Sequence, residues 1–132
     1  MTRRRPSLGM LGVFGRSGDL RALDEAFRAA DLHPALVPDA VKLTVLNVLK
    51  DAKGEDPAAR DYGEAAALLG YCALGGDAFA AANGELAAAA AERRIEAALE
   101  AGDGLDASLI LLALHAAIIH PGVQETYQLE IE

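Results

Sequence analysis

The chain has 132 residues, of which 52% are hydrophobic and only 5% aromatic, so it can form one domain whose core is mainly aliphatic. Residues 1–60 hold ten Lys and Arg against eight Asp and Glu, whereas residues 61–132 hold two against twelve. An acidic C-terminal half repels phosphate backbones, so we do not expect nucleic-acid binding. Alanine is abundant and favours helices, which predicts an all-α fold: a compact single-domain bundle of five to six helices.

Cellular location is constrained by the cysteine content and by the apolar runs. Cys72 is the only cysteine, which excludes an intramolecular disulfide and favours a cytoplasmic location. The apolar run at residues 108–119 is too short to span a bilayer, so no membrane association is expected. The first residues are basic but lack the sustained apolar segment of a signal peptide. Either Met1 or Met10 can be the initiator, and the sequence leaves this open.

The N-terminal residues 1–16 are predicted to be an irregular, partly disordered arm, although they include part of the glycine-rich stretch LGMLGVFGRSGDL. A phosphate-binding loop requires the pattern G-x-x-x-x-G-K-[ST]. Here Met10 stands at the first glycine position and Arg16 at the lysine position. We therefore interpret the stretch as an apolar segment that precedes a helix starting near Ser17 or Asp19, whose side chains can cap it.

A helical domain is predicted over residues 17–122, punctuated by glycine and proline. The last of its helices is apolar nearly all round, so we expect it to be the central helix of the core, capped by Asp106. Asp56 and Pro57 are expected to start the third helix. The predicted helices after the first, which ends before Pro34, are residues 38–53, 57–74, 78–82, 85–101 and 107–119.

The tail, residues 123–132, alternates apolar and polar residues, which is typical of a strand. A lone strand is unstable in water and needs a partner edge. We expect this extended tail to pair with residues 8–14 or with the same tail of a second subunit.

One candidate ligand-binding pocket is suggested by polar and reactive side chains on the predicted core faces. His115 is a polar group within an apolar run and needs a partner, so it is either a hydrogen-bonded core histidine or a ligand-binding residue. Cys72 fits a small buried apolar side chain. His115 and His120 are five residues apart and do not share a helix face, so we predict no metal site and no cofactor. The candidate pocket comprises Tyr62, Tyr71, Cys72 and His115.

An acidic ladder occurs on the predicted helix 85–101, where Glu92, Glu96 and Glu100 follow one another at intervals of four. Like charges at this spacing mildly destabilise a helix. The ladder is either a solvated face or a docking surface for a protein partner with a basic surface.

The sequence contains no complete functional motif, and two hypotheses about the function remain. The first is a non-enzymatic interaction module that forms a homodimer, suggested by the unpaired tail and by the alanine-rich helix 85–101. The alternative is a small-molecule-binding helical protein or minor enzyme that uses the pocket of two tyrosines, Cys72 and His115. No complete catalytic constellation favours the second hypothesis over the first.

Overall fold

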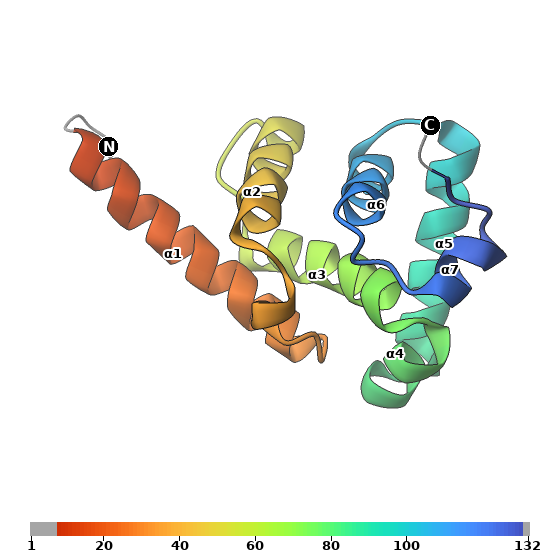
Figure 1. Ribbon diagram of the computed structural model, residues 1–132. Helices are drawn as coiled ribbons and strands as arrows, with labels where there is room; N and C mark the ends of the chain where they lie inside the picture. Colours follow the sequence, from red (N-terminus) through yellow and green to blue (C-terminus); the bar gives the residue numbers. More distant parts are fainter. Residues whose placement is uncertain (1–7, 131–132) are drawn as a thin grey trace.

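The computed structural model describes the backbone of residues 8–130 and the side chains from residue 18 onward, and this part of the chain is all-helical (Figure 1). The all-α prediction is therefore confirmed, and no strand occurs within residues 8–130. None of these helices combines the length and the apolar content needed to cross a bilayer. The elements are α1 (Leu8–Ala29), the 3-10 turn η1 (Pro34–Leu36), α2 (Asp39–Lys53), α3 (Ala59–Leu74), α4 (Gly76–Asn83), α5 (Glu85–Ala101), α6 (Leu105–His115) and α7 (Pro121–Thr126).

Helix α3 lies at the centre of the fold and packs against α1, α4, α5 and α6 (Figure 1). Small residues allow this close packing: a Cβ on Gly70 would lie 3.4 Å from the Cβ of Ala30 on the chain leaving α1. The prediction that residues 107–119 form the central helix is wrong, because α6 leaves Leu111 54% exposed. The buried residues of α3 are Tyr62, Ala65, Ala66, Leu68, Leu69, Gly70, Tyr71 and Cys72.

The bounds of α2 and α5 agree with the sequence-based prediction because glycine ends both helices. Gly54 and Gly102 have φ angles of +71° and +80°, in the left-handed region that residues with a Cβ rarely adopt. Each donates its backbone N–H to a carbonyl of the last turn. The glycine signals in the sequence thus correspond to real helix ends.

The N-terminal helix starts earlier than the sequence suggested. Residues 8–16 are helical and belong to α1, so the prediction of an irregular arm is wrong there, and residues 1–7 lie outside the described part of the chain. The expected domain boundary at residues 16 and 17 falls inside this helix. Further along α1, Leu23 and Phe27 are fully buried and fix the helix to the core.

Helix α3 starts later than predicted, because Asp61 rather than Asp56 caps it. A carboxylate oxygen of Asp61 accepts a 2.8 Å hydrogen bond from the backbone N–H of Ala58. The helix therefore begins at Ala59, and Pro57 precedes it.

The C-terminal region differs most from the prediction. Helix α6 ends at His115 because Ala117 adopts a φ of +61° and the N–H of Ile118 bonds back to the carbonyl of Ala113. The chain then crosses to α3, where the N–H of His120 donates to the carbonyl of Cys72 at 2.7 Å. Proline at the first position of a helix is favourable, and α7 starts at Pro121.

The strand-like tail predicted for residues 123–132 is therefore wrong over the described residues. Residues 123–126 are helical, and residues 8–14, the expected strand partner, are helical too. The apolar residues Val123 and Leu129 instead pack into the core, where they are 3% and 7% exposed. The expected boundary after residue 122 lies inside α7.

Candidate functional site

The four residues of the predicted pocket do not come together in the structure. Tyr62 and Tyr71 are nine residues apart on α3, a rise of about 13 Å. Their hydroxyl groups bond to different helices: Tyr62 donates to Asp19 on α1 at 3.1 Å and Tyr71 donates to Glu92 on α5 at 2.7 Å.

His115 is exposed, so the buried-core interpretation is wrong, and His115 does not line either of the two cavities described below. Its position follows from the early end of α6. The apolar run continues beyond His115, but the helix does not, and the last residue of the helix faces solvent.

Cys72 is fully buried in α3, as predicted. Burial disfavours the thiolate and raises the pKa of the Cys72 thiol to about 12. Such a thiol is protonated at neutral pH and is a poor nucleophile. Cys72 therefore acts as a small apolar side chain.

Tyr62 belongs to a charged cluster that joins α1, α2 and α3. Asp19 accepts the Tyr62 hydroxyl on one carboxylate oxygen, and the other oxygen lies 3.1 Å from Nζ of Lys50. Burial, followed by the charge and hydrogen bond of Asp19, raises the pKa of Tyr62 to about 12. The cluster ties three helices together.

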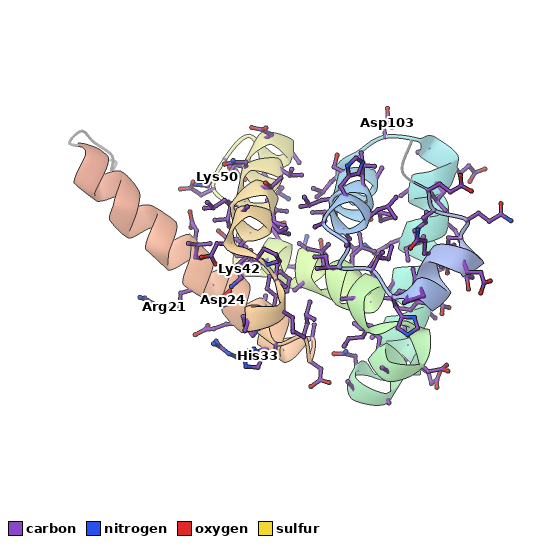
Figure 2. All side chains as sticks on the ribbon, viewed as in Figure 1. Arg21, Asp24, His33, Lys42, Lys50 and Asp103 are labelled. Atoms are coloured by element: carbon purple, nitrogen blue, oxygen red, sulfur yellow. The ribbon has the colours of Figure 1, made fainter. Side chains whose placement is uncertain are left out.

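A second charged contact lies between α1 and α2, where Figure 2 shows Lys42 next to Asp24. Nζ of Lys42 lies 3.0 Å from Oδ1 of Asp24 and 4.0 Å from Oδ1 of Asp39. Lys42 is 8% exposed, which is unusual for a lysine. Because its charge is paired, we assign this lysine to holding α2 on α1.

A polar cavity of about 480 Å³ lies at the corner between α3 and α4. Tyr71, Glu92, His120 and Tyr127 line it, and the Tyr71 ring meets Phe79 edge-on. Burial raises the pKa of Tyr71, and the hydrogen bond to Glu92 adds to this effect. Burial also raises the pKa of Tyr127. Both phenols are therefore protonated at neutral pH, and the Tyr71 hydroxyl donates a hydrogen bond to Glu92.

His120 has a structural task at this corner. Its Nδ1 accepts the N–H of Gly122 at 2.9 Å and thereby caps α7. Its ring covers Gly75, where a Cβ would approach the ring carbons to 3.0 Å. Sequence reasoning did not place His120 or Tyr127 in a site, because both depend on the turn after α6.

The acidic ladder of α5 divides into two parts. Glu92 is half-buried and accepts the Tyr71 hydroxyl, so it belongs to the polar cavity. Glu96 and Glu100 are exposed. Only these two remain available to a partner.

An apolar groove, also of about 480 Å³, lies between α5, α6 and the residues after α7. Leu99 of α5 and Leu111 of α6 line it and are 44% and 54% exposed. Leu129 contributes from the C-terminal residues, and the acidic residues Asp103 and Glu130 also line it. Figure 2 shows Asp103 projecting from the turn between α5 and α6.

No pattern in the sequence predicts this groove. Leu86, Ile95 and Leu99 are the large apolar side chains of α5, and their spacing favours burial of all three. Only Ile95 is buried, whereas Leu86 is 87% exposed. Apolar residues at helical spacing can pack against another helix of the same chain or stay exposed, and the spacing alone does not distinguish the two.

Neither metal ligands nor comparison with known proteins assigns a function to a site. Within the described residues, no three His, Cys, Asp or Glu side chains are grouped so as to hold a metal ion. Comparison with known proteins finds no matching family model, no matching curated protein and no matching solved structure.

Proposed function

We propose that this chain is a non-enzymatic interaction module that forms a homodimer through the groove between α5 and α6. The observation that carries the proposal is the pair Leu99 and Leu111, two large apolar side chains about half exposed on one groove. Single exposed leucines are ordinary on protein surfaces, but apolar side chains that line a shared groove mark a contact surface.

The energetics favour covering this groove. Burying a leucine fully contributes about 1.5–3 kcal/mol, so two half-exposed leucines offer roughly that amount in total. Ala107, which is partly exposed, also lines the groove. The alanines of α5 no longer support a subunit contact, because Ala88, Ala91 and Ala98 are buried within the chain itself.

The pKa values of the buried thiol and phenols support a binding role rather than a catalytic one. The Cys72 thiol and the Tyr71 and Tyr127 phenols all have raised pKa values, which is opposite to the shift that activates a nucleophile. The charged residues of the α1–α2 contact are paired with one another.

The test is the mass of the chain in solution, measured by light scattering during size-exclusion chromatography. The wild-type chain should have twice the chain mass at micromolar concentration. The variant Leu111→Glu should have the mass of one chain, because a carboxylate in the groove loses hydration without a partner. Leu86→Glu is the matched control, since it changes an exposed leucine of α5 away from the groove, and it should remain a dimer. A wild-type chain with the mass of one chain contradicts the proposal.

A second candidate function is small-molecule binding in the polar cavity, which replaces the pocket expected around His115. The observation that favours it is the set of protonated phenols next to Glu92 in a cavity of about 480 Å³. Native mass spectrometry of the purified chain tests it. A retained molecule that is lost in Glu92→Gln supports this function, and a chain that carries none contradicts it.

A further inference from the structure

The N-terminal segment, residues 1–17, differs in composition from the remainder of the chain. It holds four arginines and no acidic residue, and five of the seven residues 8–14 are apolar. Residues 8–17 are the first part of α1, which continues without a break to Ala29. Figure 1 shows the first turns of α1 projecting beyond the other helices. Residues 8–17 are thus an apolar helix end that carries Arg16 and no acidic residue, and that extends from the body of the fold.

The groove has the complementary character. It is lined mainly by apolar residues, and the acidic residues Asp103 and Glu130 also line it. Glu96 lies three residues before Leu99 on α5, so the two side chains are on the same side of that helix. Asp103 lies in the turn after α5 and lines the groove itself. Glu96, Asp103 and Glu130 form no ion pair with any Lys or Arg of residues 18–130.

A chain cannot fill its own groove with this segment. The second half of α1 is fixed to the core through Leu23 and Phe27, which are fully buried. The N-terminus of α1 and the α5–α6 groove lie on opposite sides of the molecule (Figure 1). A helix without a break cannot turn back across the fold, so the segment reaches a groove only on a second copy.

We infer that residues 8–17 of one chain occupy the α5–α6 groove of a second copy, with the apolar residues against Leu99 and Leu111 and Arg16 beside the acidic rim. This inference rests on the proposed homodimer and names its contact. Two chains set antiparallel about a two-fold axis bring each N-terminal helix to the partner's groove, which makes a closed, reciprocal interface. The lengths agree: residues 8–14 and the α6 stretch from Ala107 to Leu114 each extend about 10 Å.

Disulfide trapping between two single-cysteine variants tests the contact in the full-length chain. Phe14→Cys and Leu111→Cys chains, one carrying a size tag, are mixed under mild oxidation, and the native Cys72 stays out of the reaction because it is fully buried. The mixed disulfide should form at least about tenfold faster than the one between Phe14→Cys and the control Leu86→Cys, because proximity raises the effective concentration of the thiols. Equal rates for the two pairs overturn the inference.

The dimer measurement separates failure of this inference from failure of the proposed function. If Leu111→Glu separates the chains but Phe14→Glu does not, the groove is the dimer contact and another segment fills it, so only the inference is overturned. If the wild-type chain is a monomer, both are overturned. Phe14→Glu and Leu111→Glu chains that both run as monomers support both.

Charge exchange tests the basic end of the segment. Arg16→Glu should raise the dimer dissociation constant roughly fivefold, since a rim ion pair contributes up to about 1 kcal/mol. Adding Asp103→Lys to that variant should restore the affinity. Arg21→Glu, which changes an exposed arginine further along α1, is the control and should leave the affinity within about twofold. Absence of restoration by Asp103→Lys contradicts the placement of Arg16 at this rim.

Discussion

Lys42 and Asp24 form an ion pair between α2 and α1, with 3.0 Å between Nζ and Oδ1. Lys42 is 8% exposed, and Oδ1 of Asp24 is buried without a hydrogen bond of good geometry from the described residues. Removal of water from these charges is costly, and each charge offsets the cost for the other. The pair therefore holds α1 in place, and α1 is the helix that carries the N-terminal segment.

The first prediction concerns this ion pair. Lys42→Met should lower the free energy of unfolding by about 2–4 kcal/mol, because Oδ1 of Asp24 is buried and loses its cation. Urea unfolding measures the change. Arg60→Met, which breaks the exposed pair of Arg60 with Glu64, is the control and should cost less than about 1 kcal/mol.

A double variant distinguishes charge from packing at the same contact. Asp24→Leu combined with Lys42→Met removes both charges and should recover most of the stability lost in Lys42→Met. A double variant no more stable than the single one shows that packing of the lysine stem, and not the unpaired carboxylate, causes the loss.

The second prediction concerns acid unfolding and Asp61. The backbone N–H of Ala58, together with Lys53, holds the pKa of the Asp61 carboxyl below its ordinary value. A carboxyl with a lowered pKa in the folded state stabilises the fold above its unfolded pKa of about 4, and this contribution is lost as the pH falls through the lowered value.

Asp61→Asn should therefore be less stable than wild type at neutral pH, and the difference should shrink below pH about 4. Thermal unfolding as a function of pH measures this difference. The control is Asp51→Asn, which changes an exposed carboxyl of α2. A stability difference for Asp61→Asn that stays constant down to strongly acidic pH shows that Asp61 does not titrate in this way.

The third prediction concerns the tyrosines. The chain has three, and the pKa values of Tyr62, Tyr71 and Tyr127 are all raised, that of Tyr62 to about 12. An ultraviolet titration of the folded protein should therefore show no phenol ionising near pH 10, the ordinary pKa of tyrosine. Because a raised phenol pKa stabilises the fold below the ordinary value, stability should fall as the pH rises from about 10 to 12. One phenolate per chain at pH 10 in the folded state contradicts the burial of these side chains.

The fourth prediction concerns the Cys72 thiol, whose pKa burial raises to about 12. A disulfide reagent at neutral pH should react with the native chain only as fast as the chain unfolds. Addition of denaturant should release one thiol per chain at once. Rapid reaction of the native protein means that α3 opens locally around Cys72.

Local signals in the sequence predict much of the fold. Helix α5 runs from Glu85 to Ala101, as expected, because glycine flanks it on both sides. The end of α6 was not predictable in this way, since Ala117 adopts a left-handed conformation and the chain then bonds from His120 to Cys72. That bond joins residues 48 positions apart, which no short sequence window contains.

The candidate sites were less predictable than the helices, again because they depend on distant contacts. The burial of Cys72 follows from its apolar neighbours in α3, and the prediction is confirmed. The Tyr71 hydroxyl donates a hydrogen bond to Glu92, which lies 21 positions further along the chain. The spacing of the acidic residues on α5 does not predict this bond. Leu99 lines a groove and not the core, because α6 ends early and the following residues take another path.

The groove itself gives the most direct test of self-association, through the methyl signals of the four large exposed leucines of residues 18–130 in nuclear magnetic resonance spectra. The signals of Leu99 and Leu111 should shift when a concentrated sample is diluted, because dissociation uncovers the groove. Those of Leu36 and Leu86, which are 64% and 87% exposed elsewhere, should stay in place. Shifts at the first pair alone are the result that the account predicts. Four signals that do not change with concentration, or shifts at Leu36 and Leu86 alone, contradict it.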